Sequence, residues 1–216
     1  MLMPKLRAKL EAKRAERLLN QAWREAYEDY VATLSRTRFA EFARSPGDKF
    51  PDFMLPSTDG HMLALDDLLA DGPLVITFYR GKWCPFCLLL LDALAEIQPE
   101  IHKLGARLVA ITPDTGGRAL EVRQRHKADY NILCDVDSGV GLACGVMFHT
   151  PALYDSRLAA AGVDLTAYHG NPSHFVPIAA TFVVNREGFI TWRFIDVDFT
   201  ILADPEDILA ALRELA

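Results

Sequence analysis

Cysteine is scarce in this sequence: the chain has four cysteines in 216 residues. Small secreted domains depend on dense disulfide frameworks, and four cysteines in a chain of this length do not provide one. The sequence also lacks any run of about 18 apolar residues, so we expect no membrane span. It lacks a positive net charge as well, because the formal charge is -6 and the pI is near 5.5. Nucleic acids select basic surfaces. We therefore expect a reducing compartment, the cytoplasm, and neither nucleic acid nor membrane as a partner.

The first segment, residues 1–19, is basic but has no continuous apolar stretch and no small-residue cleavage site. Those absences argue against an ordinary secretory signal. Glu11 and Glu16 also count against an organelle transit peptide, because such peptides avoid acidic residues. We expect no targeting segment here.

Proline and glycine are both absent from residues 5–44, and the first break comes at Ser45-Pro46-Gly47-Asp48. Apolar residues recur here at steps of three and four, namely Leu19, Trp23, Ala26, Tyr27, Tyr30, Val31 and Leu34. This spacing predicts a helix with one apolar face. The face fits two partners equally well: the rest of its own chain, or the same face of a second copy in a homodimer. We therefore predict an N-terminal helical arm over residues 1–45 and a domain over residues 46–216.

The domain alternates runs of strand character with runs of helix character. Strand-like runs occupy residues 53–55, 61–65, 74–79, 107–112, 131–136, 181–184 and 189–195. Helix-like runs occupy residues 87–104, 117–128 and a closing segment after Asp204-Pro205. This order predicts an α/β fold in which helices flank a mixed sheet. Residues 147–175 fit neither pattern, and we predict an insertion there with one short helix.

Two of the four cysteines belong to the segment F-Y-R-G-K-W-C-P-F-C at residues 78–87, between a predicted strand and a predicted helix. The thiolate is the reactive form of cysteine, and a free thiol with a pKa of about 8.5 is mostly protonated at neutral pH. Unpaired N–H groups at a helix N-terminus favour the thiolate, as do the nearby charges of Arg80 and Lys82. A gap of two residues lets one sulfur attack a substrate while the other resolves the resulting bond. The segment predicts a redox-active pair, Cys84 and Cys87.

Other readings of these residue types are weaker. Zinc knuckles use the same spacing, but a structural zinc ion needs four ligands, and Cys134 and Cys144 do not form a second knuckle. We expect Cys134 in the core, and Cys144 either in the core or as a distant resolving thiol. The three histidines of the insertion, His149, His169 and His174, lack the carboxylate or cysteine spacing of a metal site. We therefore expect no metal and no cofactor.

Three segments of the chain resemble the family of alkyl hydroperoxide reductases and thiol-specific antioxidants (AhpC/TSA). They are P-D-F-M-L-P at residues 51–56 with Asp59-Gly60, the segment at residues 78–87, and A-T-F-V-V-N-R-E-G at residues 180–188. The resemblance covers residues from about 50 to 215 and is strongest to a peroxiredoxin-like branch with a W-C-P-x-C loop. It implies a thioredoxin-like fold and a peroxide-reducing or thiol-disulfide oxidoreductase activity.

Within this resemblance, two patterns imply different roles for the cysteines. Peroxiredoxins carry P-x-x-x-T-x-x-C, whose cysteine attacks peroxide. Cys87 occupies that position here, whereas Arg80 replaces the proline and Cys84 replaces the threonine. Ala179 stands where many peroxiredoxins place an arginine.

Thioredoxins and glutaredoxins instead carry W-C-x-x-C, in which the first cysteine is the nucleophile, and Trp83, Cys84 and Cys87 match that pattern. These proteins also place a cis-proline directly before the late strand, whereas Pro177 comes two residues earlier.

The family resemblance favours a thiol-dependent peroxidase. In the predicted scheme Cys87 attacks a hydroperoxide and becomes a sulfenic acid, and Cys84 condenses with it to form a disulfide. A dithiol donor, such as a thioredoxin- or glutaredoxin-type protein, then reduces the disulfide. Two alternatives stay open: a disulfide reductase in which Cys84 attacks first, and a non-catalytic thiol redox sensor.

Overall fold

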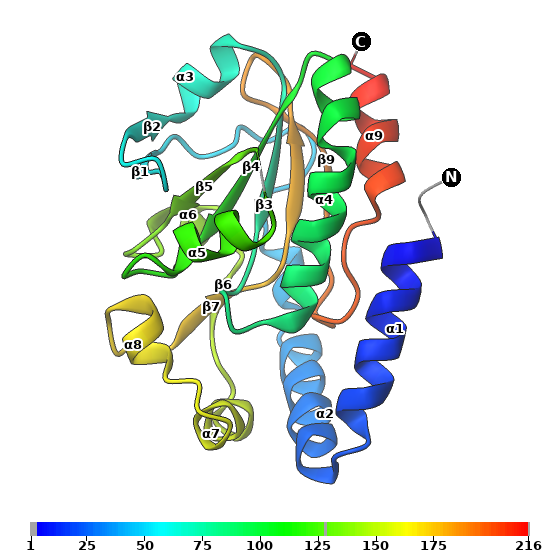
Figure 1. Ribbon diagram of the computed structural model, residues 1–216, viewed down its shortest axis with the longest axis vertical. Coiled ribbons are helices and arrows are strands. Elements are labelled where there is room, and N and C mark those ends of the chain that lie inside the picture. Colours follow the sequence, from blue (N-terminus) through cyan, green and yellow to red (C-terminus); the bar gives the residue numbers. More distant parts are fainter. Residues whose placement is uncertain (1–3, 128, 216) are drawn as a thin grey trace.

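A five-stranded mixed sheet forms the centre of the computed structural model, which describes residues 4–127 and 129–215 (Figure 1). The strand order is β5-β4-β3-β8-β9, and the strands are β3 (Leu74–Phe78), β4 (Arg107–Thr112), β5 (Asn131–Cys134), β8 (Thr181–Val184) and β9 (Ile190–Phe194). β4 runs parallel to β3 and β5, whereas β8 runs antiparallel to β3 and β9. Every residue of β3 is buried, as expected of a central strand covered on both faces. The sheet confirms the predicted α/β class.

Helices cover both faces of this sheet: α3 (Leu65–Ala70), α4 (Pro85–Lys103), α5 (Arg118–Arg125), α6 (Gly139–Ala143) and α9 (Pro205–Arg213). The inner faces of α4, α5 and α9 belong to one apolar core, and those of α3 and α6 to a second. Asp204 caps α9, because its side chain accepts the Glu206 N–H at 3.0 Å. The predicted short hairpin is confirmed as β1 (Met54–Pro56) paired with β2 (Met62–Ala64). None of the helices described is long and apolar enough to span a bilayer.

The N-terminal arm contains two helices, α1 (Pro4–Leu18) and α2 (Gln21–Arg36), followed by a 3-10 turn, η1 (Phe39–Glu41). The prediction of one helix reaching residue 44 is therefore wrong. Asn20 causes the break, because its side chain accepts the backbone N–H of Trp23 at 3.2 Å and so caps a new helix. This capping bond begins α2 directly after α1, with neither proline nor glycine between the two helices.

The apolar face of the arm packs on its own domain. Ala26, Tyr27, Tyr30 and Leu34 are buried in the core that also contains the inner faces of α4 and α9. Figure 1 shows α2 beside the N-terminal end of α4, with α1 alongside. Of the two partners that the sequence left open, the chain's own domain covers these four residues, whereas Leu19 of the predicted face is 82% exposed.

The insertion is more ordered than the sequence predicted. Its outer parts, β6 (Met147–His149) and β7 (Phe175–Pro177), pair antiparallel, and α7 (Ala152–Ala160) and α8 (Leu165–His169) lie between them. The prediction of a single short helix is wrong, since the insertion contains both α7 and α8. Its strands were not predicted, because strands of three residues that pair only with each other leave almost no periodic pattern. α7 packs against α2, so the insertion and the arm meet next to the start of α4.

Candidate active site around the cysteine pair

The cysteine pair lies where the central strand leads into a helix. The chain leaves β3 at Phe78, and Cys84, in an extended conformation, precedes Pro85 in the first turn of α4. Cys84 acts as the N-cap, because its Sγ accepts the backbone N–H of Cys87 at 3.4 Å. Both thiols are free and have no exposed surface. The structure thus brings the predicted pair together at a helix N-terminus.

Arg80 supplies the positive charge at this site. Its side chain is 1% exposed, and its Nη2 lies 3.3 Å from Cys84 Sγ and 3.3 Å from the Tyr154 hydroxyl oxygen. A buried guanidinium requires a compensating anion, since an unpaired buried charge is very costly. The sulfur of Cys84 provides that anion when it is ionised.

Aromatic rings surround the guanidinium of Arg80. Its central carbon lies 3.9 Å from the ring centroid of Phe199, 5.0 Å from Trp83, 5.6 Å from Tyr154 and 5.8 Å from Tyr30. Cations are attracted to ring faces at such distances, more strongly where water is excluded. Tyr30 comes from α2, Tyr154 from α7 and Phe199 from the segment after β9. Four separate parts of the chain therefore hold one charge in place, and we call these four rings the aromatic cage.

The two thiols differ in pKa. Burial opposes ionisation of Cys84, but the hydrogen bond from Cys87 and the charge of Arg80 outweigh it and lower the pKa of Cys84 to about 5. Burial and the neighbouring Cys84 raise the pKa of Cys87. At neutral pH this arrangement favours a thiolate on Cys84 and a protonated thiol on Cys87. These electrostatics favour Cys84 as the attacking sulfur, the reverse of the order that the peroxiredoxin pattern implies.

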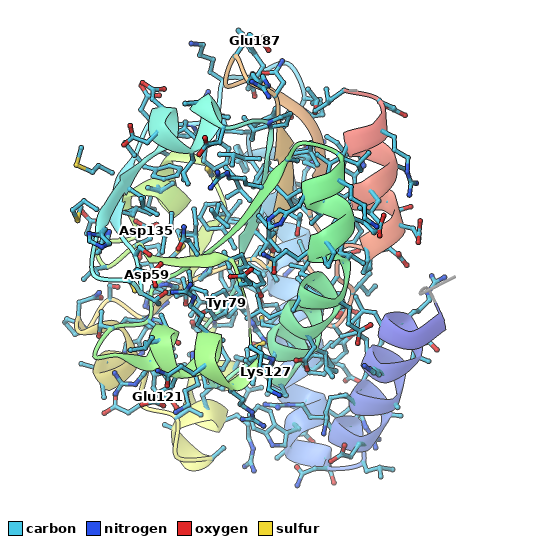
Figure 2. All side chains as sticks on the ribbon, turned by 45° about the horizontal axis from the view of Figure 1, so that its top comes forward. Asp59, Tyr79, Glu121, Lys127, Asp135 and Glu187 are labelled. Carbon is cyan, nitrogen blue, oxygen red and sulfur yellow. The ribbon has the colours of Figure 1, made fainter. Side chains whose placement is uncertain are left out.

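Lys82 acts away from the sulfurs, although the sequence placed it beside Arg80 as a second activating charge. Its Nζ pairs with Glu121 of α5, and Figure 2 shows Glu121 at the periphery of the molecule. Its backbone N–H donates to Asp114 Oδ2 at 2.6 Å. Lys82 therefore anchors the loop rather than charging the site.

Asp114 is a buried carboxyl that no pattern in the sequence indicated. It follows β4, has no exposed surface, and its Oδ1 has no hydrogen-bond partner within residues 4–127 and 129–215. Burial raises the pKa of Asp114 to about 7, although the Lys82 N–H opposes this rise. A Cβ at Gly81 would lie 2.6 Å from Asp114 Oδ1, and the φ of Gly81 is 135°. Only glycine permits this approach of the loop to the carboxyl.

The other two cysteines differ from the pair in their surroundings and in their pKa. Cys144 is buried in the second apolar core, whereas Cys84 and Cys87 belong to the first. Burial raises the pKa of Cys144, which makes it a poor nucleophile. Cys134 is half-buried at the end of β5, and burial raises its pKa too.

The remaining candidates also lie outside the pair's immediate contacts. His174 binds Asp155 and Thr166, and the described part of the chain holds no cluster of three or more metal-ligating side chains. Pro177 belongs to β7. All peptide bonds within residues 4–127 and 129–215 are trans, including the bond that precedes Pro177. Ala179 is a buried alanine and has no charge to offer. The guanidinium at this site belongs to Arg80 and does not come from the position where many peroxiredoxins place an arginine.

Comparisons with known proteins concern the family and the fold of the chain. The model of the AhpC/TSA family matches residues 46–193. A Mycobacterium tuberculosis protein named as a peroxiredoxin is 30% identical over 100 residues, which are 46% of this chain and 65% of that protein. The match thus spans slightly less than two thirds of that relative's length. A Helicobacter pylori protein named as a peroxiredoxin, bcp, is 26% identical over 151 residues, 70% of this chain and 88% of its own.

The crystal structure of peroxidoxin BcpB from Mycobacterium tuberculosis superposes with a TM-score of 0.62 at 23% identity. The superposition covers 79% of this chain and 97% of that one. At this level of identity the likeness concerns the fold, and it confirms the predicted thioredoxin-like architecture.

Proposed function

The chain belongs to the AhpC/TSA family, and from this membership we propose that it is a thiol-dependent peroxidase, which reduces hydroperoxides with electrons from thiols. One observation carries the assignment: Arg80, buried in its aromatic cage, lies within hydrogen-bond distance of the sulfur that caps α4. A thiolate held in this way is ready to attack at neutral pH. Two of the relatives are named as peroxiredoxins, which supports the same activity.

In the first step the thiolate of Cys84 attacks the terminal oxygen of the hydroperoxide. An S–O bond forms, the O–O bond breaks, and the departing oxygen takes up one proton and leaves as an alcohol. Cys84 becomes a sulfenic acid. Arg80 lies beside the reacting sulfur and stabilises the negative charge as it moves toward the leaving oxygen. The peroxiredoxin pattern gives this attack to Cys87, and that assignment stays an untested prediction.

In the second step the thiol of Cys87 condenses with the sulfenic acid of Cys84. An S–S bond forms and water leaves. A dithiol donor, of thioredoxin or glutaredoxin type, then reduces this disulfide by exchange and is itself oxidised to a disulfide. Overall, one hydroperoxide and one dithiol yield an alcohol, water and the oxidised donor.

A second candidate activity is the reduction of protein disulfides. One observation favours it: the sulfur with the lowered pKa is the first of C-P-F-C, as in W-C-x-x-C oxidoreductases. In this case Cys84 attacks a substrate disulfide, and Cys87 resolves the mixed disulfide.

Stopped-flow reduction of hydrogen peroxide by the wild type, Cys84→Ser and Cys87→Ser tests these proposals. We expect Cys84→Ser to lose fast reduction, and Cys87→Ser to keep the first attack and accumulate a sulfenic acid on Cys84 that dimedone traps. Fast reduction by Cys84→Ser would instead make Cys87 the attacking sulfur. A wild type that turns over a model disulfide but no peroxide would favour the second candidate, and turnover of neither would leave the redox sensor.

A further inference from the structure

Two phenol rings and one guanidinium group lie together beside the sulfur of Cys84. Tyr30 of α2 and Tyr154 of α7 belong to the aromatic cage, and their ring centroids are 5.0 Å apart. The central carbon of the Arg80 guanidinium lies 5.8 Å from the first centroid and 5.6 Å from the second. Nη2 of Arg80 also contacts Cys84 Sγ and the Tyr154 oxygen, each at 3.3 Å. The arm and the insertion therefore each bring one hydroxyl group close to the reactive pair.

Several hydrogen-bond donors of this group have no acceptor within residues 4–127 and 129–215. The Tyr30 hydroxyl and the Nε and Nη1 atoms of Arg80 are buried and form no hydrogen bond there. The Tyr154 oxygen accepts a bond from Arg80, and no acceptor in the same residues takes the hydrogen of its own O–H group. Buried donors are nearly always paired. A cluster of unpaired donors beside a reactive sulfur is therefore typical of a site that meets its acceptor during the reaction.

Both hydroxyl groups keep their protons at neutral pH. Burial raises the pKa of Tyr30, and the charge of Arg80 only partly opposes this rise. Burial raises the pKa of Tyr154 in the same way. The negative charge of an ionised Cys84 favours the protonated form of both groups. The two tyrosines are therefore hydrogen-bond donors, and not bases, whenever the thiolate is present.

The proposed peroxidase reaction creates a strong acceptor at this place. When the thiolate attacks a hydroperoxide, the electron pair of the O–O bond stays on the departing oxygen, which becomes negatively charged. Donors that are fixed in advance next to a developing negative charge stabilise the transition state, and they do so more strongly where water is excluded. Unpaired hydroxyl groups in a buried cage meet both conditions.

We propose that the hydroxyl groups of Tyr30 and Tyr154 donate hydrogen bonds to the departing oxygen and are catalytic residues of the peroxidase. This inference rests on the proposed function and deepens it. In this step the S–O bond forms and the O–O bond breaks. The departing oxygen takes the proton that the attacked oxygen carried, and both tyrosines keep their own protons. Cys84 is left as an ionised sulfenic acid beside Arg80.

The enclosure of these donors determines the peroxide to be used in a test. Tyr30 has no exposed surface and Tyr154 is 1% exposed, whereas Trp83, another ring of the cage, is half-buried. Because the sulfur of Cys84 is also buried, a substrate reaches it only when side chains of the cage move. Hydrogen peroxide has two heavy atoms and requires the smallest movement.

Two small peroxides with different leaving groups test the donors. Hydrogen peroxide releases a strongly basic oxygen, whereas peracetic acid releases acetate, which is stable without a donor. In stopped-flow measurements we expect Tyr30→Phe and Tyr154→Phe each to slow the reduction of hydrogen peroxide by about tenfold or more, because one donor is lost. The reduction of peracetic acid should change by less than about twofold, because its leaving group needs no such donor. Phenylalanine keeps each ring, and circular dichroism checks that the variants are folded.

Tyr27→Phe is the matched control. Tyr27 also lies on α2, but its hydroxyl group already binds Asp198, so both rates should stay at the wild-type value. An equal loss with both peroxides overturns the inference, because the hydroxyl groups would then act on the sulfur and not on the leaving oxygen. Unchanged reduction of hydrogen peroxide overturns it as well, and a loss in only one variant overturns the role of the other tyrosine. A failure of the proposed function is different, because the wild type would then reduce neither peroxide.

Discussion

Arg80 and Lys82 stand two positions apart on one loop, yet their charges act in different places. The guanidinium of Arg80 points inward to Cys84, whereas the ammonium of Lys82 pairs with Glu121 on α5. An arginine suits the inner position, because its Nη2 contacts both the sulfur and the Tyr154 hydroxyl while aromatic rings pack around the planar guanidinium. The effect of a charged side chain on the thiol therefore depends on where the side chain points more than on how near it lies in the sequence.

Arg80→Met should raise the pKa of Cys84 by about 2 or more, because an adjacent opposite charge shifts a titrating group by that order. Ultraviolet absorbance of the thiolate, followed against pH, measures the change. Lys82→Met removes the same charge from the same loop and should leave the titration of Cys84 nearly unchanged. If both variants titrate like the wild type, the N-terminus of α4, rather than Arg80, sets the pKa.

Asp114→Asn should stabilise the protein at alkaline pH more than at acidic pH. Because the pKa of Asp114 rises from 3.8 to about 7 on folding, the native state favours the protonated form, and stability is lost as pH rises through that range. Asparagine keeps an acceptor for the Lys82 N–H and carries no charge. We expect the free energy of unfolding in urea to gain roughly 2 kcal/mol more at about pH 8 than at about pH 5. An equal change at both pH values would place the titration of Asp114 outside this range.

At the scale of elements, the arm and the insertion build the cage around Arg80. Tyr30 of α2 packs against Tyr154 of α7, with ring centroids 5.0 Å apart, and against Phe199 at 4.9 Å. The arm lies before the segment that the family model matches, so this enclosure adds to the common architecture. The enclosure of Arg80, which contacts Cys84, thus depends on segments that carry no cysteine.

Tyr30→Ala should lower the free energy of unfolding by about 3 kcal/mol, as truncation of a fully buried aromatic side chain does. It should also shift the pKa of Cys84, because water entering the cavity screens the charge of Arg80 and relieves the burial that opposes the thiolate. Urea unfolding and thiolate absorbance measure the two effects. Tyr30→Phe keeps the ring and serves as the control, with a smaller loss of stability. A Tyr30→Ala variant whose thiol titrates normally would show that the cage has no electrostatic role.

Local patterns in the sequence were sufficient for the five strands of the central sheet, for the hairpin of β1 and β2, and for α4 and α9, because strand runs and helix caps depend on neighbouring residues. They were not sufficient for β6 and β7. The spacing of Cys84 and Cys87 likewise predicted the pair. Asp114 was missed because its place under the loop at Gly81 follows from the parallel pairing of β3 with β4, which no local pattern records. The cage was missed for the same reason, since its rings come from positions far apart in the sequence.

At the scale of the whole molecule, one apolar core joins the arm to the domain. Leu6 and Leu10 of α1 and Tyr30 of α2 share it with Leu90 of α4 and Ile208 of α9. The division at residue 45 stays a prediction based on sequence, and it coincides with the start of the family match. The arm and the domain therefore share one apolar core.

We therefore expect the arm and the domain to unfold in one cooperative step. A variant carrying Trp83→Phe and Trp192→Phe leaves Trp23 of the arm as its remaining tryptophan. Its fluorescence midpoint in urea should coincide with the midpoint from circular dichroism of the whole chain. An earlier transition of Trp23 would identify the arm as a separate folding unit.

The aromatic cage also has a consequence during protein synthesis. Ribosomes make the chain from its N-terminus, so Tyr30 and both cysteines emerge well before Tyr154 and Phe199. Arg80 therefore leaves the ribosome before two of the four rings that enclose it have been made. The cage can close around Arg80 only after Phe199, close to the end of the chain, has been added.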